Sequence, residues 1–174
     1  MNTDLRYPVG PFSPVTETPD VLTTSINDIE AMPTRLRAAV QGLSDPQLDT
    51  PYRPGGWTAR QVVHHVADSH MNGMIRTKLA LTESNPAIKP YDEEAWALLA
   101  DARLPIDVSL TILDAVHLRW VRVLRSLTPG QLQRTFVHPQ RGLTMTIGYQ
   151  IQDYGWHSRH HVAHITALRQ REGW

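Results

Sequence analysis

The sequence predicts an all-α protein, a four-helix bundle with long crossover loops and an extended N-terminal arm, formed as one domain over residues 1–174. Four long segments repeat apolar residues at spacings of three, four and seven, which is the pattern of amphipathic helices that share a core. A chain of 174 residues lies in the usual range of ~100–200 residues for a single domain. The segments that follow the first and third helices are also similar to each other, as in a bundle built from two helix pairs.

The chain begins with an arm, residues 1–20, that is expected to be extended. Between Tyr7 and Pro19 the sequence has too many helix breakers for a helix and too little alternation for a strand. The first long helix is expected over about residues 24–43, with Pro33 as its one interruption.

The second long helix has the clearest start. Thr58 is a favourable N-cap residue, and no breaker that would end a helix follows it before Thr82. The Asn85-Pro86 pair then ends this segment. A short helix, rich in Ala and Leu, is expected over about residues 92–100.

Two further long helices complete the bundle. The third begins at Asp107 or Ser109, either of which can cap it, and continues to Leu127. The fourth is expected over residues 147–171. The segment between them, residues 134–146, has the composition of either a small hairpin or a long loop.

The repeated connector lies after the first and third helices. Leu43-Ser-Asp-Pro-Gln-Leu48, with Tyr52 four residues on, is echoed by Leu127-Thr-Pro-Gly-Gln-Leu132, with Phe136 four residues on. The echo suggests two helix-pair halves related by an approximate twofold axis, with the site built in the core from facing helices. Chance similarity between two turns of this composition is the alternative.

The composition excludes several classes of function. Because 17 Lys and Arg residues balance 17 Asp and Glu residues, the chain lacks the excess of basic residues that is typical of nucleic-acid-binding domains. The absence of cysteine excludes disulfides and thiolate ligands, so a transition metal would be held by His, Asp or Glu. The sequence has neither a signal-peptide pattern nor the ~18 apolar residues of a membrane span, so we expect a cytoplasmic protein that does not bind membranes.

The histidines gather on two of the expected helices. Residues four apart on a helix lie one above the other, so the fourth helix presents two H-x-x-x-H pairs beside its apolar face. Neutral imidazole suits Zn, Ni, Cu and Fe(II), and three imidazoles leave positions open for water or substrate. The pattern predicts a catalytic metal site. The clustered histidines are His64, His65 and His70 on the second helix and His157, His160, His161 and His164 on the fourth.

Periodicity does not decide between the two H-x-x-x-H pairs. By helical phase, His157 and His161 lie slightly closer to the centre of the apolar face than His160 and His164.

Phase also ranks the other histidines. His65 flanks the apolar face of the second helix and is the better third ligand, whereas His64 leans toward solvent. His70 lies in the apolar face and is expected to be a core residue. His117 and His138 are isolated and are expected to be structural or exposed.

Two stretches of the chain resemble the DinB/YfiT-like family, and best its YfiT branch of metal-dependent hydrolases. They are Trp57-Thr-Ala-Arg-Gln-Val-Val-His-His-Val-Ala-Asp68 and His160-His-Val-Ala-His-Ile-Thr-Ala-Leu-Arg169. The resemblance covers nearly the whole chain. It implies a four-helix bundle, often dimeric, with one divalent metal ion held by three histidines.

The resemblance also implies the ligands. The family pattern "His, aliphatic, Ala, Asp" falls on His65 to Asp68, and the terminal H-x-x-x-H falls on His160 and His164. The implied metal ligands are therefore His65, His160 and His164, against the slight preference of the helical phase. The expected ion is Zn or Ni, the expected partner is a small-molecule substrate, and the expected assembly is a homodimer.

By this resemblance the function is metal-dependent hydrolysis, in which the ion activates water. The first alternative is a metal-dependent S-transferase that uses a low-molecular-weight thiol such as bacillithiol. Further alternatives are a metal-binding bundle without catalysis and a helical interaction module without metal. Hydrolysis needs a base, and because His161 follows His160 where a metalloprotease has Glu, the candidates are His157, His161 and Asp68.

Polar residues near the histidines are the last candidates. Asp68 and Asp153 each lie one helical turn from a clustered histidine and could accept its second N–H, or be ordinary solvated carboxylates. Arg60, Arg76 and Arg159 are expected to be surface residues, although a guanidinium can also bind the carboxylate of a substrate.

Overall fold

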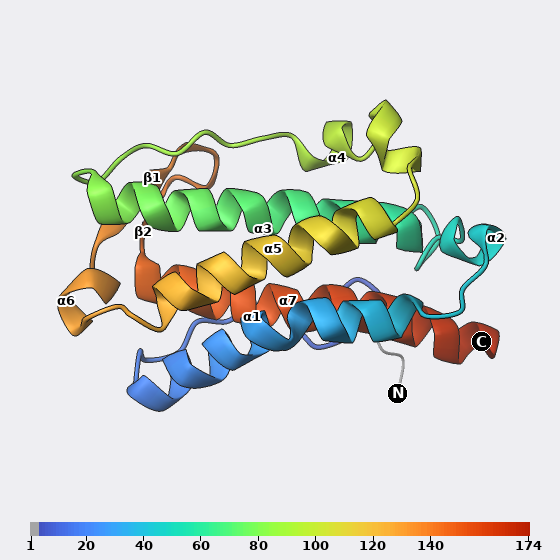
Figure 1. Cartoon of the computed structure of the whole chain (residues 1–174), viewed down its shortest axis with the longest axis horizontal. Helices are drawn as coiled ribbons and strands as arrows, with labels where there is room; N and C mark the ends of the chain where they lie inside the picture. Colours follow the sequence, from blue (N-terminus) through green and yellow to red (C-terminus); the bar gives the residue numbers. More distant parts are fainter. Residues whose placement is uncertain (1–3) are drawn as a thin grey trace.

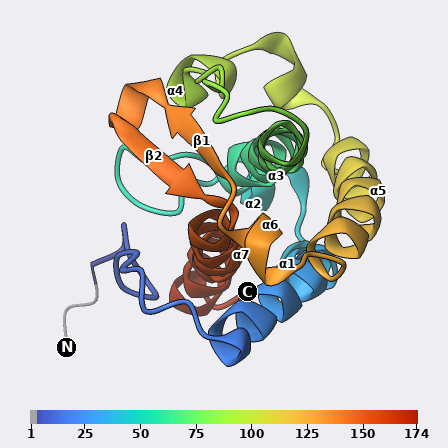
Figure 2. The same ribbon diagram turned by 90° about the vertical axis from the view of Figure 1, so that its left-hand side faces the viewer.

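The computed structural model describes residues 4–174 and contains the expected bundle of long helices. The four helices pack in a ring in which α1 contacts α5 and α7, and α3 contacts the same two (Figure 2). The helices α3 and α5 run in the same direction, so residues 83–106 cross back along the bundle between them (Figure 1). The long helices are α1 (Pro19–Val40), α3 (Ala59–Thr82), α5 (Asp107–Leu124) and α7 (Ile147–Glu172).

Local capping explains where these helices begin. Thr58 caps α3 as predicted: its side chain accepts from the Gln61 N–H at 3.1 Å, and the Gln61 side chain accepts from the Thr58 N–H at 2.9 Å. Thr146 caps α7 with the same extended backbone conformation, and its side chain accepts from the Tyr149 N–H at 2.9 Å. At the other end of α7, Gly173 adopts a left-handed conformation with φ of 75°.

One predicted helix start and one predicted cap were wrong. Helix α1 begins at Pro19 and not near residue 24, because Thr18 caps it and proline is compatible with the first helical turn. Helix α5 begins at Asp107, but its cap is Ile106, and neither Asp107 nor Ser109 caps it with a side chain. The predicted short helix is also divided, into α4 (Glu93–Trp96) and the 3-10 helix η1 (Ala100–Arg103).

The two similar connectors fold alike. Each forms one helical turn, α2 (Asp45–Leu48) or α6 (Pro129–Leu132), and each turn is closed by a capping box. After α6 the chain forms an antiparallel hairpin of β1 (Thr135–His138) and β2 (Leu143–Thr146). Of the two structures expected for residues 134–146, the hairpin is therefore the one observed.

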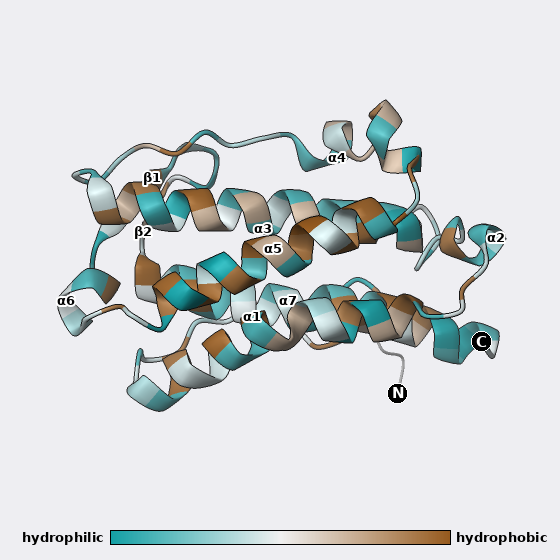
Figure 3. Cartoon of the chain, viewed as in Figure 1, coloured by the Kyte–Doolittle hydropathy of each residue, from teal (hydrophilic) through white to brown (hydrophobic). Residues whose placement is uncertain are grey.

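The apolar side chains form two clusters along the bundle. One cluster joins the ends of the long helices nearest α2 and includes Leu36, Val62 and Ile165. The other lies toward the hairpin and includes Trp120 and Ile151. Hydrophobic and hydrophilic residues alternate along each long helix, as burial of one face requires (Figure 3). None of the helices in residues 4–174 is long and apolar enough to cross a membrane.

The N-terminal arm lies on α7. The Val15 N–H donates to Gln152 Oε1 at 3.0 Å, and Trp156 Nε1 donates to the Gly10 carbonyl at 2.9 Å. Phe12 packs edge-on against Tyr149. The arm therefore covers one side of the helix that carries four of the clustered histidines.

Arg60 is not the surface residue that the sequence suggested. Its side chain is 9% exposed and donates to Asp49 at 2.6 Å and to Asp45 at 2.7 Å. These two ion pairs attach α3 to the α2 connector. Arg159, by contrast, is half-exposed and pairs with Asp28 of α1.

A glycine allows α3 to approach two buried aromatic rings. A Cβ atom at Gly73 would lie 2.6 Å from Tyr154 Cζ and 2.7 Å from Trp120 Cη2, both of which belong to buried residues. Only a residue without a side chain fits at this contact.

We predict that Gly73→Ala lowers the free energy of unfolding by about 1–3 kcal/mol, because overpacking a filled core outweighs the gain in helix propensity. The measurement is urea denaturation followed by circular dichroism. Gly130→Ala is the matched control, since a Cβ there meets no atom within 4 Å. Equal stability of the two variants would contradict this account of the α3–α7 contact.

Candidate metal centre

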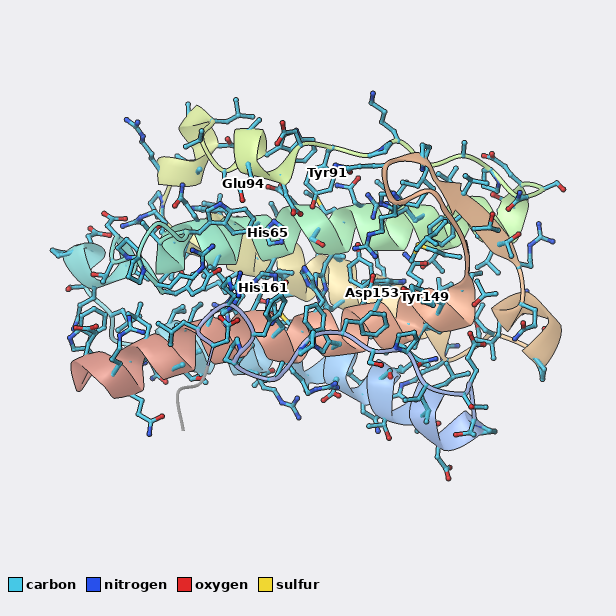
Figure 4. All side chains as sticks on the ribbon, turned by 180° about the vertical axis from the view of Figure 1, so that it is seen from behind. His65, Tyr91, Glu94, Tyr149, Asp153 and His161 are labelled. Atoms are coloured by element: carbon cyan, nitrogen blue, oxygen red, sulfur yellow. The ribbon has the colours of Figure 1, made fainter. Side chains whose placement is uncertain are left out.

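Histidines from α3 and α7 meet inside the bundle. His65 of α3 joins His157 and His161 of α7 in a group whose ligand atoms all lie within 4.8 Å of one another. Figure 4 shows His65 and His161 facing each other across the space between the two helices. A second group on α7, with the same 4.8 Å limit, contains His160, His161 and His164.

The structure does not unite the three ligands that the family resemblance implied. His65 belongs to the first group, whereas His160 and His164 belong to the second. His161 is common to both groups. The pair that helical phase slightly favoured, His157 and His161, is the pair that lies with His65.

Burial keeps these imidazoles neutral. It lowers the pKa of His65 to about 4, with a further decrease from His164. It also lowers the pKa of His157 and His161 well below the ordinary value, and the neighbouring histidines add to the effect. At neutral pH each ring therefore has an unprotonated nitrogen, which is the form that binds a metal ion.

The ring nitrogens of the first group differ in their hydrogen bonding. Nδ1 of His157 lies 3.1 Å from Nε2 of His70, and Nε2 of His157 lies 3.5 Å from Ser69 Oγ. In the part of the chain that the structure describes, Nδ1 of His161 is buried with no hydrogen-bond partner. A buried nitrogen without a partner is costly. A metal ion would bind the lone pair of such a nitrogen. The residues of this group therefore fit a metal ion.

The second group has different surroundings. Nε2–H of His164 donates to the Arg6 carbonyl of the arm at 3.1 Å, and the ring stacks on Tyr52 at 3.9 Å between centroids. His160 stacks on Trp156 at 4.3 Å. Burial lowers the pKa of His160 to about 3 and that of His164 to about 4. These two rings are therefore neutral, and both pack against aromatic side chains.

The remaining histidines have structural contacts. His64, predicted to lean toward solvent, is buried; its Nε2–H donates to the Leu104 carbonyl at 3.1 Å, and Nδ1 accepts from Ser109 Oγ at 2.7 Å. His117 donates to the Ile29 carbonyl at 2.6 Å.

His70 is fully buried, as expected for a core residue, yet it also contacts the candidate ligand His157. No local sequence pattern indicates this contact, because 87 positions separate the two residues. Its other nitrogen, Nδ1, has no partner among the described residues, and its ring stacks on His117 at 4.8 Å between centroids.

Neither predicted carboxylate forms a hydrogen bond with a clustered histidine in residues 4–174. Asp153 instead accepts from Arg141 at 3.0 Å, and burial raises its pKa against the opposing effect of that guanidinium. Burial, together with Asp101, raises the pKa of Asp68 to about 6.

A cavity of about 570 Å³ adjoins the first histidine group. His65, His157 and His161 line it, together with His160. It extends along α7 toward Asp153, which lies one helical turn before His157, and Figure 4 shows Asp153 and Tyr149 farther along that helix. The candidate ligands therefore face a space large enough for a small molecule.

Comparisons with known proteins agree with this architecture. Residues 28–165 match the model of the DinB superfamily. A protein of Bacillus mycoides (strain KBAB4), named "Putative metal-dependent hydrolase", is 56% identical over 98% of this chain and 99% of its own length. A protein of Bacillus cereus (strain B4264) with the same descriptive name has the same identity and coverage.

One solved structure extends the agreement to three dimensions. YfiT from Bacillus subtilis, described as a probable metal-dependent hydrolase with an unusual four-helix bundle topology, superposes with a TM-score of 0.94. It is 48% identical in sequence, and the match covers 98% of each chain. Since the family model spans most of the sequence and both kinds of relative match almost its full length, the chain belongs to the DinB superfamily and is a relative of YfiT.

Proposed function

We propose that this protein is a metal-dependent hydrolase in which His65, His157 and His161 hold one divalent ion. The observation that carries the proposal is the meeting of three neutral, largely buried imidazoles within 4.8 Å at the wall of a cavity. Relatives named as metal-dependent hydrolases support the reaction class. Three nitrogen ligands suit Zn or Ni.

The competing ligand set is His65, His160 and His164. His164 already donates Nε2–H to the Arg6 carbonyl, which leaves only its buried Nδ1 for a metal. In His157, Nδ1 lies 3.1 Å from His70 Nε2, and Nε2 lies 3.5 Å from Ser69 Oγ, a long contact that a metal ion could replace. The set that contains His157 is favoured because His65 shares a 4.8 Å group with His157 and His161, whereas His160 and His164 belong to the other group.

When bound, a divalent ion would supply Lewis acidity and a water whose pKa falls toward ~7. The chain supplies the rest of the site. Burial keeps the imidazoles unprotonated, and His70 fixes the orientation and tautomer of His157 through its ring nitrogen. Trp57 packs 4.5 Å from the His65 ring and restricts its rotation.

The first prediction concerns metal content. We expect about one Zn or Ni ion per chain in protein purified without a His-tag. His65→Ala, His157→Ala and His161→Ala should each weaken metal affinity by more than about 100-fold, because each removes a ligand and not merely a residue that orients one. The measurement is elemental analysis combined with competition against a chelator.

His160→Ala and His164→Ala are the matched controls, since both come from the same helix and are also buried. They should retain the ion. Loss of the ion in these two variants, with retention in His157→Ala, would establish the competing set. Absence of any ion in wild-type protein incubated with Zn or Ni would refute the metal-dependent function.

The second prediction concerns His70. Replacement by Phe removes the nitrogen that contacts His157, so we expect metal affinity to fall about 10- to 100-fold. His70→Gln keeps a polar atom that can accept from His157 Nδ1–H and should recover part of the affinity. Equal affinities of the two variants, with unchanged circular dichroism, would show that the contact does not orient His157.

The reaction class is tested by substrate turnover in metal-loaded protein. Hydrolysis requires that ester or amide substrates are consumed without added thiol. Consumption only in the presence of a low-molecular-weight thiol such as bacillithiol would replace hydrolysis by S-transfer, in which the chain without cysteine would depend on a thiol from outside.

A further inference from the structure

The cavity beside the histidines also has a charged wall that the proposed metal chemistry does not use. Arg76 of α3 and Arg141 of the hairpin line this wall, together with Asp153 of α7. A guanidinium remains charged at any pH at which the protein is folded. The partners of these two arginines therefore decide what the wall can bind.

Arg141 is already paired. Its Nη1 lies 3.0 Å from Asp153 Oδ2, and the Asp153 side chain is only 12% exposed. This ion pair balances one positive charge with one negative charge and attaches the hairpin to α7.

Arg76 differs from Arg141. Its guanidinium has no ion-pair partner among residues 4–174, and its Nε is buried without a hydrogen-bond partner. A guanidinium at a partly buried position is costly when no carboxylate pairs with it directly. An oxyanion that entered the cavity would provide a counter-charge.

The other titratable groups at this wall form no ion pair with Arg76 among the described residues. His138 is neutral at pH 7, because burial and the two arginines lower its pKa to about 4. Glu93 is the remaining carboxylate at the cavity: burial raises its pKa, Arg141 and Arg76 act in the opposite direction, and it forms no ion pair with either arginine in residues 4–174. Asp153 is engaged by Arg141.

Helix geometry gives the axial spacing between Arg76 and the part of α3 that lies beside His157. Ser69, which lies beside His157, precedes Arg76 by seven residues on α3, equivalent to a rise of about 10 Å. A molecule that touched both positions would be a small acid, which suits a cavity of about 570 Å³.

We propose that Arg76 binds a carboxylate of the substrate, so that the substrate class is small organic acids that extend from Arg76 toward the histidines along the cavity. The inference deepens the proposed function and depends on it for the reaction, but the binding of the carboxylate itself requires only Arg76 and the cavity.

The test uses benzoate and benzamide, which share one shape and differ in charge, as probes in isothermal titration calorimetry at pH 7. Wild-type full-length protein should bind benzoate at least about tenfold more tightly than benzamide, the effect expected of one charge-assisted pair. Arg76→Met should abolish this preference and leave benzamide binding unchanged. Arg76→Lys, which keeps the charge but loses the planar fork, should retain part of it.

Arg37→Met is the matched control, because Arg37 is a half-exposed arginine paired with Asp114 away from the cavity. It should bind both probes as the wild type does. Each titration is repeated after chelator treatment, with metal content and circular dichroism measured on the same samples, because benzoate could also coordinate a metal ion.

The outcomes separate this inference from the proposed function. A preference for benzoate that survives chelation and disappears in Arg76→Met supports the inference even if the protein holds no metal. An unchanged preference in folded Arg76→Met, or no preference in the wild type, overturns it while leaving the metal site intact. Binding of inorganic phosphate that depends on Arg76, without binding of benzoate, also overturns the assignment to carboxylates.

Discussion

The burial of several neutral imidazoles between α3 and α7 is the constraint on which the rest of the structure depends. A histidine taken out of water loses the hydration of two ring nitrogens, and the low pKa of His65, about 4, reflects that loss. The cost is offset where another polar group lies within reach, as His70 does for His157. Where no such group exists, a metal ion is the natural partner.

The histidines converge only if the two helices keep their rotation and their relative height. Capping by Thr58 and Thr146 fixes where α3 and α7 begin. A start shifted by one residue would rotate every later side chain by about 100°. The contact of Gly73 with Tyr154 then fixes their height, and Tyr154 also donates to the Ser69 carbonyl at 2.9 Å. Packing thus orients the site from outside the histidine groups.

The cavity brings two kinds of side chain together along one pair of helices. At one end, neutral nitrogen donors can hold an ion that polarises a bond. Farther along, an unpaired guanidinium can hold the charge of a bound molecule. Separate sites for orientation and for chemistry let an enzyme use binding energy to position the reacting group. The arm, through Tyr7 at the cavity wall, adds an aromatic side to this space.

The sequence by itself determined the long helices, the Thr58 cap of α3 and the gathering of histidines on two helices, because apolar spacing and capping are local properties. Only the tertiary structure decided which histidines meet, since His65 and His161 come from different helices whose relative rotation no local pattern records. The same reason explains why Arg60 is buried in ion pairs whereas Arg76 forms none in residues 4–174. Packing between distant segments determines the partner of each charge, and the local sequence around an arginine does not indicate it.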